Sequence, residues 1–293
     1  MVVAKGLHIV RMGEHHLREV FSLIDRENWG WEFTEIQAIH RLDPGSSIVA
    51  LDGKEIVGLL TCIDYGSTAF IVHIIVREGW RGKGVGVRMV QEALDDLDSR
   101  GISTVELDAN PEAADFYDQF SFRRVEGISF MVKDPPHDAL RVAEDAASYA
   151  WLGPSDMPAV AEATSAAMGH RGDEVLRAMT KLPPDHALSS VGPGRPRDVI
   201  VSRAAVALNA AGPWVMERPT AARAESMMRT LVSGMPAKRV DLLVPVSSEP
   251  AAPALRACGF RSARDGIVRM ARSSEPVRRF PASVLAVGHL GLI

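Results

Sequence analysis

The stretch from Ala69 to Leu97 limits the fold of this chain more than any other part of the sequence. Its first eight residues, Ala69–Val76, are almost all apolar or β-branched, which is typical of a strand buried on both faces. Farther along, apolar residues recur with the spacing of one helix face at Val90, Ala93, Leu94 and Leu97. The stretch therefore predicts a central strand that leads through a short loop into a helix.

The loop between this strand and this helix contains glycine at the alternate positions 82, 84 and 86, and Arg81 and Lys83 flank the first of them. Glycine lets the backbone approach a ligand closely, and the free N–H groups at the start of a helix point toward an anion. The arrangement indicates a phosphate-binding loop. A tight turn without a ligand is the alternative, although a plain turn rarely needs three alternating glycines.

The glycine spacing excludes two common phosphate-binding motifs. A P-loop requires Lys followed by Ser or Thr, whereas Gly84 follows Lys83 here. A dinucleotide fingerprint requires a glycine where Val87 stands. The segment Ile74-Ile75-Val76 followed by Trp80-Arg81-Gly82-Lys83-Gly84-Val85-Gly86 instead closely resembles the acetyl-CoA signature of the GNAT superfamily of N-acetyltransferases.

The resemblance extends over residues 5–133 and implies an α/β fold with a mixed sheet. Hydrophobic periodicity and turn residues predict the matching order of elements. Strands are expected at 7–11, 47–51, 55–65, 69–76, 104–108 and 122–133, and helices at 15–28, 33–42, 86–97 and 113–120.

Composition describes an ordinary globular protein. The 293 residues suggest one large or two ordinary domains, and the formal net charge of −4 gives no electrostatic case for binding nucleic acid or a membrane surface. No run reaches the length of a membrane span, and no signal peptide is evident. The two cysteines, Cys62 and Cys258, indicate neither a disulfide framework nor a metal site. A cytoplasmic protein without a bound metal is expected.

The second half repeats the order of elements in the first. Residues 113–123 align without gaps on residues 251–261, a shift of about 138 residues that corresponds to one domain. Two tandem GNAT-like domains are therefore predicted, at 1–134 and 135–293, and an unrelated α/β appendage is the alternative. Strands are expected at 148–152, 199–203, 205–209, 214–217 and 239–244, and helices at 157–168, 172–181, 220–234 and 251–257.

The second copy has the features of a degenerate domain. Ahead of its helix at 220–234 it reads Met216-Glu217-Arg218-Pro219-Thr220, which contains no glycine, and Pro219 lacks an N–H group. Leu255 stands where the first copy has Tyr117. We expect the second domain to have lost catalysis and cofactor binding.

The GNAT resemblance implies positions for the cofactor, acetyl-CoA, which acts as co-substrate. Its pyrophosphate would bind the backbone of the loop, and its pantetheine arm would lie along the edge of the central strand and contact Asn110. The implied cofactor-binding residues are Ile74, Ile75, Val76, Arg81, Gly82, Lys83, Gly84, Val85, Gly86 and Asn110.

Two residues are candidates for proton transfer. Tyr117 matches the family tyrosine that gives a proton to the coenzyme A sulfur, although Ser121 replaces the usual glycine of that motif. His73 has a suitable intrinsic pKa to take the proton of the amine, and a core histidine is the alternative. Trp29 and Trp31 could form a substrate wall or pack in the core.

The leading functional prediction is an acetyl-CoA-dependent N-acetyltransferase that acts on a primary amine of a small molecule or peptide, by direct attack in a ternary complex. A non-catalytic acyl-CoA-binding sensor is the alternative from another class. Tyr117 favours the enzyme, because binding alone does not need a proton donor. We expect a monomer or a homodimer.

Overall fold

The computed structural model describes residues 6–137, 148–168, 185–190, 196–204 and 208–288. The chain forms two compact units, and their make-up does not simply follow the order of the sequence. The first unit consists of the residues up to Asp108, Tyr117–Arg123 and Ala271–Pro276, and the second consists of Ala109–Phe116, Arg124–Met270 and Val277 onward. Each unit therefore includes a segment from the other half of the chain, and the expected domain boundary at residue 134 stays a prediction.

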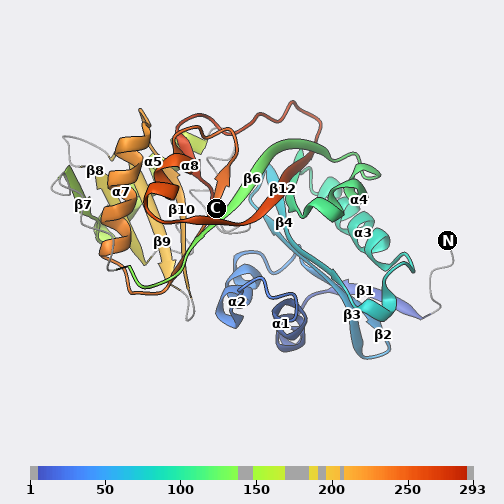
Figure 1. Cartoon of the computed structure of the whole chain (residues 1–293). Helices are drawn as coiled ribbons and strands as arrows, with labels where there is room; N and C mark the ends of the chain where they lie inside the picture. The colour runs from blue at the N-terminus through green and yellow to red at the C-terminus, as the bar shows by residue number, and fades with distance from the viewer. Residues whose placement is uncertain (1–5, 138–147, 169–184, 191–195, 205–207, 289–293) are drawn as a thin grey trace. The chain divides into compact units, whose positions relative to one another are not determined.

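The sheet of the first unit has the strand order β1-β2-β3-β4-β5 (Figure 1). Its strands are β1 (Leu7–Arg11), β2 (Ile48–Asp52), β3 (Glu55–Asp64), β4 (Thr68–Val76) and β5 (Thr104–Ala109). The first four pair antiparallel, whereas β4 and β5 are parallel and need a crossover between them. Each strand lies within one residue of its predicted bounds.

Helices cover both faces of this sheet. Figure 1 shows α1 (Leu17–Asp25) and α2 (Phe33–Leu42) on one side and the crossover helix α3 (Val85–Ser99) on the other. The four residues that predicted the apolar face of α3, namely Val90, Ala93, Leu94 and Leu97, are all buried. The first helix is shorter than predicted, because residues 14–16 form a 3₁₀ turn and the α-helix ends at Asp25.

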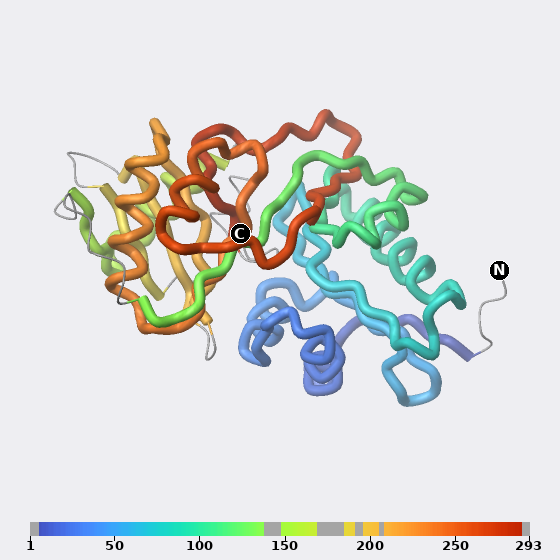
Figure 2. Tube along the Cα trace, in the orientation of Figure 1, coloured from blue at the N-terminus to red at the C-terminus, as the bar shows by residue number. Residues whose placement is uncertain are grey.

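The late segment 271–276 joins the first unit through specific contacts. Arg272 forms a bidentate ion pair with Asp98 of α3, at 2.8 and 2.7 Å. The hydroxyls of Ser273 and Thr104 lie 2.7 Å apart, and Ser274 N–H donates to a carbonyl beside the start of β5. Figure 2 shows the red trace of this segment beside the segments of the first unit that come earlier in the sequence.

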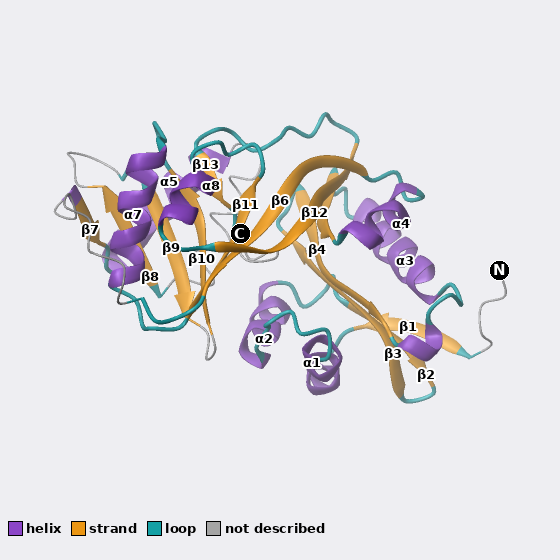
Figure 3. Ribbon diagram, viewed as in Figure 1, coloured by secondary structure: helices purple, strands orange, loops and turns teal. Residues whose placement is uncertain are grey.

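The sheet of the second unit has the order β6-β11-β10-β9-β8-β7, and β13 pairs with β10 (Figure 3). Only β10 and β11 are parallel in this series. The strands are β6 (Arg123–Lys133), β7 (Tyr149–Trp151), β8 (His186–Ser190), β9 (Val199–Ala204), β10 (Leu208–Val215), β11 (Arg239–Pro245), β12 (Arg261–Ser273) and β13 (Val284–Ala286).

Two separate cores lie on the two faces of this second sheet. One contains side chains from α7 (Ala221–Ser233) and α8 (Ala251–Ala257) together with Leu242 and Val244. The other contains side chains from α5 (Met157–Met168) together with Leu243. Successive side chains of a strand point to opposite faces, so β11 contributes to both cores.

The second unit departs from its predicted elements at several points. The strands expected at 205–209 and 214–217 overlap one strand, β10, which is interrupted by a bulge; residues 205–207 lie outside the described residues. β8 and β13 were not predicted, because β8 lies in a stretch rich in Pro and Gly and β13 has only three residues. The helix expected at 172–181 lies outside the described residues, whereas the predicted helices at 157–168 and 251–257 are confirmed.

The internal repeat is visible in the local backbone. Phe122 N–H donates to Tyr117 O at 3.4 Å after α4 (Ala114–Asp118), and Phe260 N–H donates to Leu255 O at 3.0 Å after α8. The residues before the two phenylalanines, Ser121 and Gly259, both have left-handed backbones with φ of 67° and 79°. The ungapped alignment of the two segments therefore corresponds to the same helix-ending turn.

Candidate functional site

The parallel pair β4 and β5 separates part of the way along its length. The ladder joins Thr68–Ile71 to Thr104–Leu107, and within the described residues β5 does not pair with β4 beyond Ile71. On its other side β4 stays paired with β3 up to Val76, but the register shifts by one residue at Val72. This β-bulge redirects the strand, which agrees with the separation from β5.

Burial along β4 follows the same division. Thr68–Ile71 are buried, whereas Val72, Ile74 and Val76 are half-buried. The expectation of a strand buried on both faces is therefore correct for the first part of β4 and wrong for the second. The backbone from Ile74 to Val76 lies along the opening between the two strands, where an extended ligand could pair with it.

The glycine loop follows directly after this open edge. Gly82 and Gly84 have φ of 73° and 79°, a left-handed conformation that glycine adopts readily. A side chain added at Gly82 would meet nothing within 4 Å. Gly84 is the N-cap of α3 and provides no side-chain hydrogen bond, so the first N–H groups of the helix are available to an anion.

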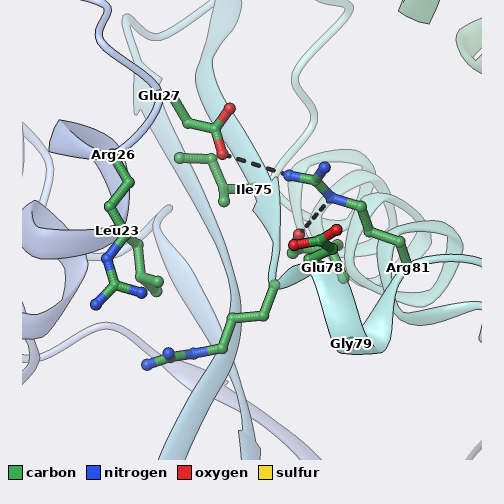
Figure 4. Close-up of a pocket in the computed structure, with 9 residues that line it drawn as sticks. Leu23, Arg26, Glu27, Ile75, Glu78, Gly79 and Arg81 are labelled. Atoms are coloured by element: carbon green, nitrogen blue, oxygen red, sulfur yellow. Dashed lines mark hydrogen bonds and ion pairs between the residues drawn. The ribbon is translucent and has the colours of Figure 1, made fainter.

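A cavity of about 380 Å³ lies beside the loop and the end of β4. Its walls come from Leu23 of α1 and the residues 26–27 that follow this helix, and from residues 75–79 and Arg81 (Figure 4). The Arg81 guanidinium donates to Val76 O at 2.9 Å and lies 3.4 Å from the Glu27 carboxylate, which joins the two walls. Lys83 packs over the Trp80 ring at 5.3 Å. The sequence offered no signal that α1 would form one of these walls.

His73 lies in an aromatic cluster on the first unit. Its ring stacks on Trp29 with centroids 5.8 Å apart and meets Trp31 edge-on at 4.6 Å. Its Nδ1 lies 2.7 Å from Thr61 Oγ1, and its backbone N–H donates to the same oxygen at 3.1 Å. His73 and Trp31 are buried and Trp29 is half-buried. The contact with Thr61 depends on strand register, which the sequence did not reveal.

Tyr117 is almost fully buried and packs edge-on against Phe122, with centroids 5.9 Å apart. Burial raises the pKa of its phenol to about 12, so the hydroxyl is protonated at neutral pH. Tyr117, His73, the edge of β4 and the glycine loop all belong to the first unit.

Asn110 belongs to the second unit, where its side-chain oxygen accepts a hydrogen bond from Arg264 at 2.9 Å. A cofactor contact by Asn110 stays a prediction.

The two cysteines lack the properties of a catalytic nucleophile. Cys62 and Cys258 are free and buried, and burial raises the pKa of both thiols, so neither is an activated nucleophile. Among the described residues, no group of three or more His, Cys, Asp or Glu side chains could hold a metal ion. In that same part of the chain, no helix combines the length and the apolar composition needed to cross a membrane.

Comparison with known proteins decides the family of the first part of the chain. Residues 14–122 match the model of the acetyltransferase (GNAT) family. This chain carries a GNAT domain. A curated relative of the domain is N-alpha-acetyltransferase 30 of Schizosaccharomyces pombe, 29% identical over 89 residues. The match covers 28% of this chain and 59% of that protein, so it spans less than two thirds of the relative's length.

Solved structures of GNAT proteins have a similar fold over most of the chain. A GCN5-related N-acetyltransferase from Sphaerobacter thermophilus matches with a TM-score of 0.68 at 17% identity, covering 97% of this chain and 100% of that one. A tandem GNAT protein from the clavulanic acid biosynthesis pathway matches with a TM-score of 0.67 at 15% identity, covering 92% and 99%. The fold class is therefore the predicted mixed α/β fold of GNAT proteins, and the division of this chain into two tandem GNAT-like domains stays a prediction.

Proposed function

We propose that this protein is an acetyl-CoA-dependent N-acetyltransferase whose acceptor is a primary amine of a small molecule or a peptide. The observation that carries the proposal is the opened edge of β4 beside a glycine loop and an uncapped helix. The backbone at Ile74–Val76 offers hydrogen-bonding groups for an extended amide chain, and the loop and the start of α3 offer N–H groups for a pyrophosphate. The open strand edge suits the pantetheine arm of coenzyme A, and the loop that follows it suits the pyrophosphate.

The proposed reaction is a direct transfer. The amine nitrogen forms a bond to the acetyl carbon while the C–S bond breaks, and a β4 N–H group stabilises the charge on the carbonyl oxygen. Tyr117 would give its phenolic proton to the leaving sulfur, and it would regain a proton from the attacking nitrogen, which gives one up after the attack as the amide forms. Its raised pKa supports this role only in that the group carries its proton at neutral pH.

The acceptor must lose a proton, because an alkylammonium with a pKa of about 10.4 cannot attack. We propose His73 as the group that receives it. Thr61 contacts Nδ1 at 2.7 Å, so the transfer would involve Nε2. The position of His73 between Trp29 and Trp31 agrees with an apolar wall at the acceptor side.

Thiol release from acetyl-CoA, measured across a panel of amines, tests the proposal. The full chain should release thiol only with a suitable primary amine, and mass spectrometry should find one added acetyl group on that amine. Cofactor binding without release for any amine would favour a non-catalytic acyl-CoA sensor. Absence of cofactor binding would exclude both functions.

A further inference from the structure

The second unit contains the same opening between parallel strands as the first. β10 and β11 pair over Leu208–Ala210 and Arg239–Asp241, and their ladder ends there. On its other side β10 stays paired with β9, with a register shift between Ala211 and Trp214. A short parallel ladder followed by a bulge is also the arrangement of β4 and β5. We call the opening beside β4, where we propose that the pantetheine arm binds, the pantetheine slot. The second unit has a corresponding slot between β10 and β11.

In the second unit a segment of the chain itself occupies this slot. β13 pairs antiparallel with β10, placing Ala286 opposite Trp214 and Val284 opposite Val215. Val287, the next residue after β13, forms a bridge to β11, and its N–H donates to Leu243 O at 2.9 Å. The strand thus bonds to both of the separated strands. It pairs with the part of β10 that follows the bulge, which corresponds to the edge at Ile74–Val76 in β4.

β13 is a packed part of the second unit. Each residue from Val284 to Val287 is at most 2% exposed. Leu285 belongs to the core formed with α7 and α8, whereas Val284 and Val287 belong to the core formed with α5. The backbone also comes very close to Gly212, because a Cβ placed there would lie 2.3 Å from Val287 O. This close approach requires glycine at position 212.

The region that corresponds to the glycine loop is also satisfied internally. Asp198 is buried, and its carboxylate accepts a hydrogen bond from Glu217 N–H at 3.0 Å and forms an ion pair with Arg223. Thr220 caps α7 by accepting from Arg223 N–H at 3.3 Å. The Asp198 carboxylate supplies the anion and the Thr220 hydroxyl supplies the cap, so an incoming phosphate would have to displace both.

We propose that β13 is the built-in occupant of the second unit's pantetheine slot, and that this unit therefore binds no acyl-CoA. A peptide strand offers the same alternating N–H and C=O groups as the amides of a pantetheine arm, so it satisfies the two separated strands permanently. The proposal does not depend on acetyl transfer by the first unit, because it concerns only the contacts of β10, β11 and β13.

Hydrogen–deuterium exchange of the full chain, with and without coenzyme A, tests the proposal. Peptides covering 208–217 and 280–288 should be protected in the free protein and unchanged by coenzyme A. Calorimetry should find no more than one equivalent bound. A second equivalent, low protection of 280–288 in the free protein, or a change of protection in either peptide would overturn the proposal. If the full chain binds no coenzyme A at all, the proposed function is refuted, and the protection of 280–288 in the free protein still decides this proposal.

Gly212→Ala provides a directed variant, and Gly153→Ala is its control. The added methyl at 212 collides with the Val287 carbonyl, so exchange at 280–288 should accelerate at least tenfold while a peptide covering 69–80 is unchanged. An added methyl at Gly153 has only an ordinary contact, 3.9 Å from Asp156, so that variant should exchange as the wild type does. Unchanged protection of β13 in a folded Gly212→Ala protein would overturn the assignment. If that variant does not fold, the wild-type exchange and titration still decide.

Discussion

Replacement of Gly82 by alanine separates the proposed ligand contact from backbone strain. Gly82 has a φ of 73°, and an added Cβ would meet nothing within 4 Å. The protein should therefore fold with no clash and lose only about 1–2 kcal/mol, the cost of a left-handed non-glycine residue. The open space at Gly82 is where we expect the pyrophosphate, so acetyl-CoA affinity should fall at least tenfold, or about 1.4 kcal/mol.

Gly101→Ala is the matched control for this experiment. Gly101 has a φ of 77° and is likewise open within 4 Å, but it lies at the end of α3 that is opposite the loop. Both variants should lose similar stability in thermal unfolding, and only Gly82→Ala should lose affinity in calorimetry. If both variants bind acetyl-CoA as tightly as the wild type does, the loop is not a cofactor contact. A much larger stability loss for Gly82→Ala would refute the inference that its surroundings are open.

Four further predictions concern Tyr117, Ser121 and the Asp98–Arg272 ion pair. Tyr117→Phe should lower kcat by about 10²–10⁴-fold with little change in cofactor affinity, whereas Tyr149→Phe should keep normal turnover; equal kcat values would make Tyr117 a packing residue. Because the folded pKa of Tyr117 is raised to about 12, its stabilising contribution is complete below the unfolded pKa of about 10 and is lost as the pH rises through about 12. Denaturant titrations should therefore find that Tyr117→Phe loses less stability over this pH range than the wild type. Ser121→Gly should stabilise the protein by no more than about 1 kcal/mol, because relief of about 1–2 kcal/mol of left-handed strain at a φ of 67° is offset by the entropic cost of glycine, about 0.4–1 kcal/mol; a lower Tm would contradict this. The Asp98–Arg272 pair should show a coupling of no more than about 1 kcal/mol in a double-mutant cycle, since both side chains are partly exposed. Arg272 lowers the pKa of Asp98, so this coupling should be present above about pH 4 and disappear as the pH falls; a coupling that persists there would have another cause.

Local pattern determined much of the first unit. The apolar run at 69–76, the alternating glycines and the helical spacing after them each depend on neighbours in the sequence, and the structure has the expected strand, loop and helix there. The turn that ends α4 is also a local feature, and the left-handed backbone at Ser121 explains why glycine is the usual residue at that position. The alignment of the two halves identified the corresponding turn at Gly259.

Tertiary structure decided everything that depends on register and on pairing between distant residues. The bulge at Val72 and the end of the β4–β5 ladder arise where three strands meet, and no local pattern encodes them. The approach of Thr61 to His73 depends on the register of β3 against β4. β13 has too few residues to give a periodic signal, and it becomes a strand because the separated edges of β10 and β11 supply partners for its backbone.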